Sequence, residues 1–473
     1  MEKYQLFIDG EWVATEQYYD LTSPYNGETI AQVPLANAAQ VEGALSSAQK
    51  ATTVMRGLTA LERSNILRKV SDLFEERLEE CAKILTKEAA KPLKAARMEI
   101  MRTVETYRFA AEEAKRIHGE TVPMDAAKGG KGKFGLTKRE PLGVIAAITP
   151  FNFPFNLAAH KLGPAFAAGN TVVLKPASQT PLSAFMTARL FEEAGLPAGA
   201  LNVVTGRGGD VGDILVTDER VKMVTFTGSM EVGLSIKQKV GLKRVTLELG
   251  SNSGVIVDSV ENMEAVAARC AEGAFSFAGQ VCISTQRIYV REELYEEFLK
   301  YMVEKTQQLV VGDPSSEHTD VSALINSRET ERIEQWIHEA VQGGATIRTG
   351  GKREGTIFQP TIIANGHPTL SLSCMEAFGP VVLVNSYNNW DEAIQLVNNS
   401  EYGLQAGVYT TSVHKAFDAF ERLEVGGVII NDIPTFRVDQ MPYGGVKNSG
   451  IGKEGIKYST EEMTELKFAA FQL

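Results

Sequence analysis

The chain has 473 residues, of which 44% are hydrophobic and 23% are charged, and it carries a formal net charge of −11. A chain of this length exceeds one compact core, so we expect two or three domains. The composition excludes disordered and membrane classes and is typical of a folded globular protein. The acidic balance argues against a nucleic-acid partner, because such a surface does not neutralise phosphates.

No targeting, membrane or disulfide pattern is evident. The N-terminus lacks the basic region and apolar core of a secretory signal, and no apolar run reaches membrane-spanning length. The 6 histidines form no HExxH pattern, and the cysteines are far apart, without CxxC pairs: Cys81, Cys270, Cys282 and Cys374. We therefore expect a reduced, cytoplasmic protein with no structural disulfide and no metal site.

The first 140 residues change character twice. Residues 6–33 predict short β segments, and Asp9-Gly10 provides a hairpin turn. Residues 38–117 carry apolar side chains at helical spacing, which Pro92 interrupts. Residues 119–139 include a run of glycine and lysine, which indicates a solvated loop.

From residue 143 onward, short β-branched runs alternate with helical segments, which is typical of βαβ units and a mainly parallel sheet. Strands are predicted at 144–148, 171–174, 201–204 and 223–226, with a helix at 182–194. The pattern pauses at 245–248 and resumes at 255–257, 287–290, 381–384 and 428–430. This pause indicates a second α/β domain beginning near residue 250. Residues 463–468 alternate as a terminal strand would.

Three side chains at element ends are candidates for chemistry. Cys282 lies between a helical run at 266–277 and a strand at 287–290, where a thiol is either a small buried hydrophobe or a nucleophile. Asn152 follows a strand and either donates to an oxyanion or makes an Asx-turn. Glu248 ends an apolar strand and is either a general base with a raised pKa or a hinge residue.

Two further stretches suit a phosphorylated ligand. Lys175 ends a strand, where its ammonium either binds ribose hydroxyls or phosphates or is a surface cation. The turn at Gly228-Ser229 opens a helix, so its backbone N–H groups can approach an anion. Residues 206–210 are glycine-rich, which fits a phosphate cradle and a plain loop equally well. None of these stretches is a GxGxxG motif.

In this order, the pieces resemble the aldehyde dehydrogenase superfamily over essentially the whole chain. The motifs that carry the resemblance are Phe151-Asn152-Phe153-Pro154, Lys175-Pro176-Ala177-Ser178, Phe226-Thr227-Gly228-Ser229, Leu247-Glu248-Leu249-Gly250, Gly279-Gln280-Val281-Cys282, Glu376-Ala377-Phe378-Gly379-Pro380 and Pro442-Tyr443-Gly444-Gly445-Val446-Lys447-Asn448-Ser449-Gly450.

The resemblance implies an α/β fold with two doubly wound parallel-sheet domains, one a Rossmann-like cofactor domain and one catalytic, plus a small β oligomerisation arm. The expected bounds are 1–118 and 140–249 for the NAD(P)-binding domain, 250–453 for the catalytic domain, and 119–139 with 454–473 for the arm. A homodimer or homotetramer is expected from the same resemblance.

The resemblance also implies a role for each matching residue. Cys282 resembles the nucleophile that forms a thiohemiacetal with the aldehyde and then, after hydride transfer to the nicotinamide, a thioester. Asn152 and the backbone N–H of Cys282 resemble the oxyanion hole, and Glu248 resembles the base that activates water. Lys175 is grouped with these catalytic residues and with those expected to bind NAD or NADP: Thr149, Pro150, Phe151, Lys175, Ser178, Gly208, Phe226, Gly228, Ser229, Leu249, Glu376 and Phe378.

Three positions depart from the family pattern. Phe151 stands where tryptophan is usual, which alters packing more than chemistry. Ser251 replaces the second glycine of the usual pair, so its side chain bears on how Glu248 or the nicotinamide moves. Ser178 stands where NAD-preferring relatives often carry glutamate. Without that carboxylate a 2′-phosphate is not repelled, so NADP is permitted.

Two residues bear on the substrate. Arg437 lies in the loop that flanks the substrate tunnel in relatives, and it suits a phosphate, sulfonate, carboxylate or neighbouring hydroxyl. The alternative is a structural salt bridge with Asp432 or Asp439. His160 replaces the arginine of relatives that act on succinic semialdehyde, which disfavours that substrate.

We therefore expect a short hydroxylated or anionic aldehyde, such as lactaldehyde, glyceraldehyde 3-phosphate or sulfolactaldehyde. A succinate-semialdehyde or broad-range aldehyde dehydrogenase is the alternative. Enzymes of this fold that transfer the acyl group to coenzyme A lack a counterpart of Glu248, which disfavours that class. The intact set of Cys282, Glu248, Asn152 and Lys175 disfavours a non-enzymatic role.

Overall fold

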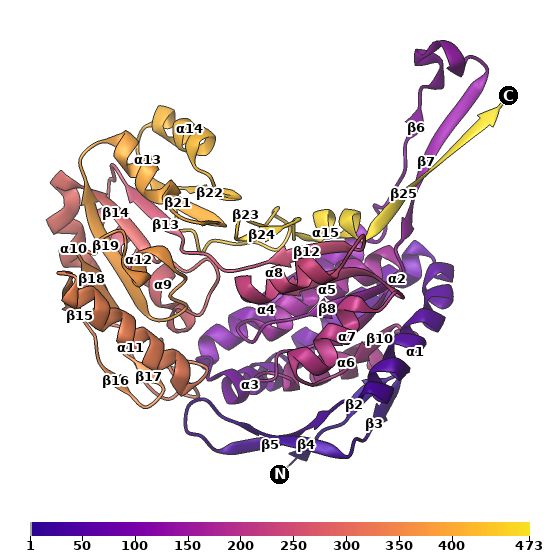
Figure 1. Ribbon diagram of the computed structural model, residues 1–473, viewed down its shortest axis with the longest axis horizontal. Coiled ribbons are helices and arrows are strands. Elements are labelled where there is room, and N and C mark those ends of the chain that lie inside the picture. Colours follow the sequence, from indigo (N-terminus) through magenta and orange to yellow (C-terminus); the bar gives the residue numbers. More distant parts are fainter. Residues whose placement is uncertain (1) are drawn as a thin grey trace.

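Two largely parallel sheets organise residues 2–473, which are the residues described by the computed structural model (Figure 1). The first sheet has eight strands in the order β24-β12-β11-β8-β9-β10-β2-β3. Its five central strands run parallel, whereas β2, β3 and β24 are antiparallel to their neighbours. The strands are β2 (Leu6–Ile8), β3 (Glu11–Val13), β8 (Val144–Ile148), β9 (Thr171–Lys175), β10 (Leu201–Val203), β11 (Val221–Thr227), β12 (Arg244–Glu248) and β24 (Gly450–Ile451).

Helices cover both faces of this sheet, which explains why its central strands are apolar on both sides. Val144 and Ala146 of β8 pack against α1, α7 and α8, whereas Ile145 and Ala147 pack against α2–α6. The helices are α1 (Ala38–Gly57), α2 (Ala60–Glu76), α3 (Leu78–Ala89), α4 (Leu93–Glu113), α5 (Pro154–Ala168), α6 (Leu182–Glu193), α7 (Asp213–Thr217), α8 (Met230–Lys239) and α15 (Ile456–Glu462).

Local signals divide the predicted helical stretch of residues 38–117 into four helices. Asn37 and Thr59 begin α1 and α2 with capping boxes, in which each side chain accepts from the backbone N–H three residues on. Pro92 separates α3 from α4, as expected for a residue that lacks a backbone donor. The helical prediction is therefore confirmed, with breaks where the capping residues and Pro92 lie.

The second sheet has seven strands in the order β15-β18-β19-β14-β13-β21-β22, and all but β15 are parallel. The strands are β13 (Gly254–Val257), β14 (Arg287–Arg291), β15 (Thr346–Thr349), β18 (Thr361–Ala364), β19 (Val381–Tyr387), β21 (Gln405–Tyr409) and β22 (Gly427–Ile430). The helices are α9 (Met263–Phe275), α10 (Glu292–Gln307), α11 (Ser327–Gln342), α12 (Ser371–Cys374), α13 (Trp390–Asn398) and α14 (Val413–Arg422).

The two predicted doubly wound domains are confirmed by these sheets, with two differences in detail. The apparent pause at 245–248 is a strand, β12, which pairs parallel with β11 and extends the first sheet. Its alternation of Arg244 and Thr246 with apolar residues resembles an edge strand more than a buried one. In the second sheet, strands β15, β18 and β21 were not predicted.

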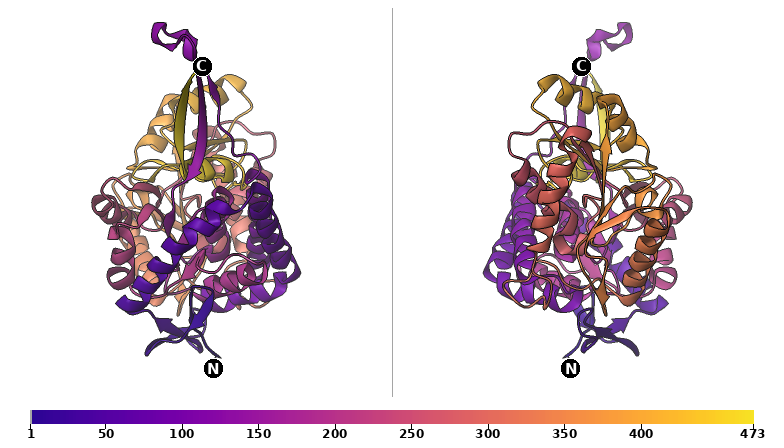
Figure 2. Two further views of the ribbon diagram at one scale, coloured as in Figure 1. Left: turned by 90° about the vertical axis from the view of Figure 1, so that its right-hand side faces the viewer. Right: turned by 90° about the vertical axis from the view of Figure 1, so that its left-hand side faces the viewer.

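A hairpin arm projects from the first body, at the upper right of Figure 1 and at the top of both views in Figure 2. Strand β25 (Thr464–Gln472) pairs antiparallel with β7 (Lys133–Pro141) along its whole length, and β6 (Thr121–Val122) adds a short third strand. The predicted terminal strand is confirmed. Short 3₁₀ turns at Met124–Ala126 and Lys128–Gly130 form the tip, where a solvated loop was predicted.

Residues 450–463 belong to the first body, whereas the expected bounds divided them between the catalytic domain, ending at 453, and the arm, beginning at 454. Strand β24 joins the first sheet beside β12, and α15 packs its Ile456 into the core of the first body. Of residues 454–473, those of β25 belong to the arm, because they pair with β7.

The remaining strands form small sheets at the periphery. They are β1 (Glu2–Lys3), β4 (Gln17–Thr22) and β5 (Thr29–Leu35) in one sheet, with the pairs β16 (Arg353–Glu354)–β17 (Ile357–Phe358) and β20 (Tyr402–Gly403)–β23 (Val446–Lys447). Within residues 2–473, no helix combines the length and apolar character needed to cross a membrane.

Candidate active site

A cavity of about 250 Å³ lies between the two bodies, and the Cys282 side chain is part of its wall. Its other side chains come from α4, from the start of α5, from the end of α9 and from the loop at 433–443. Three of them are arginines: Arg102, Arg269 and Arg437.

A backbone kink after α9 presents Cys282 to this cavity. Phe277 and Ala278 have φ values of +47° and +53°, a strained region for residues with a side chain. Gly279 follows at φ +69°, where a Cβ would lie 2.2 Å from the carbonyl oxygen of Gly379. Only glycine permits that approach, which explains on steric grounds why the motif has glycine at position 279.

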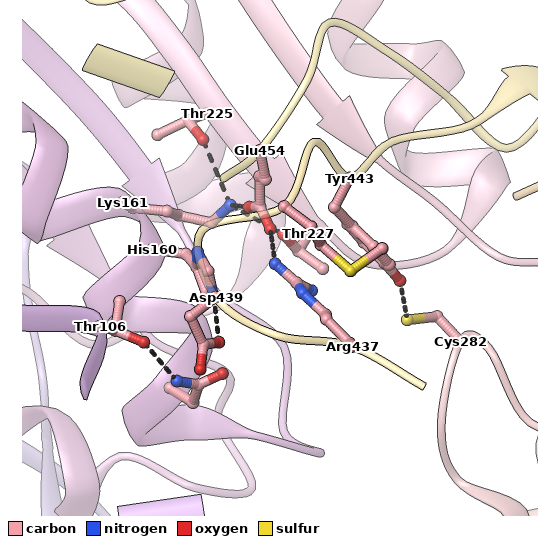
Figure 3. Close-up of polar contacts among 12 residues, drawn as sticks. Thr106, His160, Lys161, Thr225, Thr227, Cys282, Arg437, Asp439, Tyr443 and Glu454 are labelled. Carbon is pink, nitrogen blue, oxygen red and sulfur yellow. Dashed lines mark hydrogen bonds and ion pairs between the residues drawn. The ribbon is translucent and has the colours of Figure 1, made fainter. Parts of the chain in front are cut away.

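The Cys282 thiol has one side-chain partner. Its Sγ lies 2.8 Å from the hydroxyl oxygen of Tyr443 (Figure 3). Burial raises the pKa of Cys282 to about 11, while the Tyr443 hydroxyl and the Arg437 guanidinium act in the opposite direction. The sequence prediction did not include Tyr443 among the site residues, although its motif carried it.

Asn152 is held beside the cysteine loop. Its Nδ2 donates to the backbone carbonyl of Gln280 at 3.0 Å, two residues before Cys282, and its Oδ1 has no partner. The backbone carbonyl of Asn152 accepts from the buried ammonium of Lys91 at 2.5 Å. The structure therefore brings the amide of Asn152 next to the cysteine loop, and it adds Lys91, which the sequence prediction missed.

Lys91 is itself fixed by its surroundings. Its ammonium pairs with the buried Glu99 and lies 3.7 Å and 4.4 Å from the ring centroids of Phe153 and Phe277.

Glu248 ends β12 with both carboxylate oxygens buried and without a hydrogen-bond partner. Burial and the nearby carboxylate of Glu454 hold the pKa of Glu248 well above its usual range. A Cβ at Gly444 would lie 2.8 Å from Glu248 Oε1, so the carboxyl group packs against the bare backbone of that glycine. An unpaired buried acid of this kind is poised to take up a proton.

Glu454 is a second buried acid, and the sequence prediction had assigned it to the arm. Its Oε1 accepts from Lys161 at 3.0 Å and its Oε2 from Arg437 at 3.0 Å (Figure 3). Although burial opposes ionisation, these two cations lower the pKa of Glu454 to about 2. Glu248 and Glu454 are thus neighbouring carboxyl groups whose pKa values are displaced in opposite directions.

Both salt-bridge partners predicted as the alternative for Arg437 are wrong. Asp432 pairs with Arg269 at 2.7 Å, and Asp439 pairs with Arg102 at 2.7 Å. Arg437 instead pairs with Glu454, its guanidinium carbon lies 3.7 Å from the ring centroid of Tyr443, and its Nε has no partner.

His160 does not reach the cavity, contrary to its predicted place among the substrate residues. It is buried on α5 and its Nε2 lies 2.8 Å from Asp439 Oδ1. Burial and the nearby Arg437 lower the pKa of His160, so the imidazole is held neutral. The imidazole orients Asp439 rather than facing a substrate.

A second cavity, of about 590 Å³, contains three of the residues expected to bind a cofactor: Lys175, Gly208 and Phe226. Burial lowers the pKa of Lys175, whose ammonium makes one long hydrogen bond of 3.4 Å to the Pro176 carbonyl and so retains free donors. A Cβ at Gly208 would meet nothing within 4 Å, which leaves the loop backbone open. An ammonium with free donors beside an open glycine loop fits the ribose and phosphates of a dinucleotide.

The neighbouring expected residues are placed as follows. Thr149 and Pro150 follow β8, and the Thr149 N–H donates to the backbone carbonyl of Lys175. Ser178 is exposed, and its carbonyl accepts from Tyr19. Ser229 begins α8 at the surface. The Gly228 N–H is not free for a phosphate, because it donates to the Glu248 carbonyl at 3.1 Å, and Leu249 packs against Gly233.

A second group of the expected cofactor residues comprises Glu376, Phe378 and Phe151. The rings of Phe151 and Phe378 meet edge to face at 5.8 Å. The Ser251 N–H donates to Glu376 Oε1 at 3.0 Å, and burial raises the pKa of Glu376 to about 7. The Ser251 hydroxyl lies 3.2 Å from that of Ser253, which is its hydrogen-bond partner.

Comparisons with known proteins agree with this arrangement. The family model described as the aldehyde dehydrogenase family matches residues 12–469. The chain is 46% identical over 473 residues to the 3-sulfolactaldehyde dehydrogenase of Priestia aryabhattai, covering 100% of this chain and 99% of that protein.

Two solved structures superpose closely. Aldehyde dehydrogenase 21 from Physcomitrella patens, in complex with the reaction product succinate, has a TM-score of 0.98 at 41% identity and covers 100% of this chain and 98% of its own. Glyceraldehyde-3-phosphate dehydrogenase from Methanocaldococcus jannaschii, complexed with NADP, has a TM-score of 0.93 at 38% identity, covering 97% of this chain and 100% of its own. Matches of this extent and identity show that the chain belongs to the aldehyde dehydrogenase family.

Proposed function

We propose that this protein oxidises a short anionic or hydroxylated aldehyde to the carboxylic acid with NAD or NADP, through covalent catalysis by Cys282. One observation carries the proposal. A thiol bonded to a tyrosine hydroxyl lines the cavity between the two bodies, the amide of Asn152 is tied to its loop, and a buried, unpartnered Glu248 packs nearby.

The residues divide the reaction between them. The Cys282 thiolate adds to the carbonyl carbon, and the resulting oxyanion accepts from the Asn152 amide and the Cys282 backbone N–H. For this the Asn152 Nδ2 exchanges its bond to the Gln280 carbonyl for one to the oxyanion. Loss of hydride leaves a thioester on Cys282. Glu248 in its ionised form then removes a proton from water, which attacks the thioester and releases the acid and the Cys282 thiolate.

A bound nicotinamide dinucleotide would supply the hydride acceptor. Lys175 would hold ribose hydroxyls, and the open loop at Gly208 with the helix start at Ser229 would face the phosphates. Glu376 and Phe378 would lie at the nicotinamide ribose. Ser178 places no carboxylate near a 2′-phosphate, which supports the use of NADP as well as NAD.

The charges around the cavity support an anionic substrate. Arg269 is neutralised by Asp432 and Glu272. Arg437 shares Glu454 with Lys161, so two cations face one carboxylate. The excess positive charge and the unpartnered Nε of Arg437 suit a sulfonate, phosphate or carboxylate.

The names of the relatives agree with this chemistry, since sulfolactaldehyde and glyceraldehyde 3-phosphate are both hydroxylated anions. Succinic semialdehyde is the second candidate, because the Physcomitrella patens enzyme is in complex with its reaction product succinate, and a carboxylate meets the same arginine chemistry.

An aldehyde panel tests the function. Purified protein is mixed with NAD or NADP and with sulfolactaldehyde, glyceraldehyde 3-phosphate, lactaldehyde, succinic semialdehyde or propanal, and the reduced cofactor is followed by absorbance. We expect turnover without coenzyme A, fastest with the anionic hydroxyaldehydes. No signal with any aldehyde and either cofactor would overturn the proposal.

Substitution of Arg437 tests the substrate class. For Arg437→Leu we expect the KM of anionic aldehydes to rise roughly 10- to 100-fold, as for loss of a charge-assisted hydrogen bond, and that of propanal to change little. Arg269→Leu is the matched control, because that arginine lines the same cavity but is neutralised by its own carboxylates. An equal rise for propanal would leave Arg437 with only its structural role beside Glu454.

The arm supports self-association. Its strand β25 pairs on one side only, with β7, and exposes Leu466, Phe468 and Phe471. Exposed apolar residues on an unpaired edge strand favour a partner strand, so a homodimer or homotetramer is proposed. The four free cysteines agree with a reducing, cytoplasmic location.

A further inference from the structure

Tyr443 makes a contact that the mechanism above does not use. Its side chain is buried and its hydroxyl oxygen lies 2.8 Å from Cys282 Sγ, within hydrogen-bond range of a sulfur. Its ring packs with Phe277, Val281 and Ile283, the residues that form the cysteine loop. The hydroxyl thus touches the reacting atom from within the wall of the cavity.

The tyrosine is held from two sides. The Arg437 guanidinium lies over its ring at 3.7 Å, and Glu454 anchors that guanidinium at 3.0 Å. The backbones of Tyr443 and Glu454 also exchange two hydrogen bonds, of 3.0 Å and 2.6 Å. Figure 3 shows the dashed contacts that join Cys282 to Tyr443 and Arg437 to Glu454. These contacts hold the Tyr443 ring, and with it the hydroxyl, beside the sulfur.

The charges around the thiol favour such a donor. Glu248 and Glu376 both disfavour a thiolate at Cys282, whereas Tyr443 and Arg437 favour it. Lys91 and Arg102 also line the cavity, but Glu99 and Asp439 neutralise them.

We propose that Tyr443 is a catalytic residue whose hydroxyl donates a hydrogen bond to the thiolate of Cys282. Arg437 acts as a positioning residue by stacking on the Tyr443 ring. The cation over the ring makes the phenol a stronger donor. Burial and the neighbouring thiol hold the pKa of Tyr443 well above its usual range, so the phenol keeps its proton and serves as a donor only.

The same bond would act twice in the cycle. It stabilises the attacking thiolate before the carbon–sulfur bond forms, and it stabilises the leaving thiolate when water breaks that bond during hydrolysis. No proton passes through the tyrosine in either step. This inference rests on the proposed role of Cys282 as the nucleophile.

The direction of the hydrogen bond between Tyr443 and Cys282 decides how removal of the hydroxyl changes the pKa of the thiol, so the two directions can be told apart. If the thiol donated to the phenol oxygen, Tyr443 would stabilise the neutral thiol and its removal would favour the thiolate. If the hydroxyl donates to the thiolate, removal raises the pH at which the thiol ionises.

The experiment measures alkylation of Cys282 by iodoacetamide against pH in the full-length protein without cofactor. A Cys374→Ser background removes the exposed second thiol. In Tyr443→Phe we expect the midpoint to rise by about one pH unit, and the rate below the midpoint to fall about tenfold. Tyr409→Phe is the matched control, because this buried hydroxyl has no hydrogen-bond partner. Its profile should match the parent.

A midpoint that is unchanged or lower in Tyr443→Phe would overturn the inference. Ultraviolet absorbance of the thiolate, taken as the difference from Cys282→Ser, gives the same midpoint without a reagent. Arg437→Gln provides a second variant, in which a smaller rise of the midpoint is expected and no rise would remove Arg437 from the positioning role. Because iodoacetamide is neutral and no aldehyde is present, a failed aldehyde panel with an intact midpoint shift would count against the proposed function alone.

Discussion

Lys91 donates a hydrogen bond from its buried ammonium to the backbone carbonyl oxygen of Asn152, at 2.5 Å. The same ammonium pairs with Glu99, whose Oε1 accepts from the backbone N–H of Phe155 at 3.0 Å, in the first turn of α5. The junction between α3 and α4 thereby fixes both the proposed oxyanion residue and the start of the helix that follows it.

Removal of this cation should destabilise the protein and displace Asn152. In Lys91→Met the carboxylate of Glu99 stays buried without its ion-pair partner, and we expect a loss of about 3–5 kcal/mol in the free energy of unfolding. Chemical denaturation measures the loss. The double variant Lys91→Met/Glu99→Gln should recover much of it, since the amide oxygen still accepts from α5. A double variant as unstable as Lys91→Met would show that the charge is not the cause.

Glu248→Gln should separate the two halves of the reaction. Acylation does not need the base, so a burst of reduced cofactor is expected, whereas hydrolysis should slow about 100- to 10,000-fold. Rapid mixing with an aldehyde measures both phases. An unchanged steady state would exclude Glu248 as the base.

The same substitution should alter stability in a pH-dependent way. Burial and Glu454 raise the pKa of Glu248 in the folded state, so the native protein retains a proton that the unfolded chain has released. The stabilisation by that proton is complete below the unfolded pKa and is lost as pH rises through the folded one. Relative to the parent, Glu248→Gln should therefore gain melting temperature as pH increases from 5 to 9. A constant difference across this range would contradict the raised pKa.

Ser178→Glu should shift cofactor use towards NAD. The added carboxylate would face a 2′-phosphate, and like-charge repulsion should raise the KM for NADP roughly 10- to 100-fold while leaving NAD little affected. The backbone bond from Tyr19 to the Ser178 carbonyl does not depend on the side chain. Ser178→Gln has the same size without the charge and serves as the control. If both variants lose NADP equally, bulk rather than charge is responsible.

The arm should control assembly. In Leu466→Glu/Phe468→Glu two exposed apolar side chains on one face of β25 become charged, and we expect dissociation to smaller species. Light scattering after size-exclusion chromatography measures the mass. Lys467→Glu, on the opposite face of the same strand, changes charge without removing apolar surface. A parent protein that is already monomeric would exclude the proposed assembly.

Local sequence determined much of this structure. Runs of β-branched residues predicted the central strands, because strands covered by helices on both faces must be apolar throughout. The motifs around Asn152, Glu248 and Cys282 predicted the chemistry of each residue. The strand that Glu248 ends, β12, was harder to assign to the first sheet, since Arg244 and Thr246 interrupt its apolar pattern.

Only the tertiary structure decided which of these groups meet. Sequence proximity suggested Asp432 or Asp439 for Arg437, but α9 and α4 bring Arg269 and Arg102 to those carboxylates. Arg437 instead pairs with Glu454, which lies just before α15, where the chain packs against the first body. Likewise Lys91 and Tyr443 carry no local signal of their contacts with Asn152 and Cys282. Periodicity reports which face of an element is buried, whereas the pairing of buried polar groups depends on how distant elements pack.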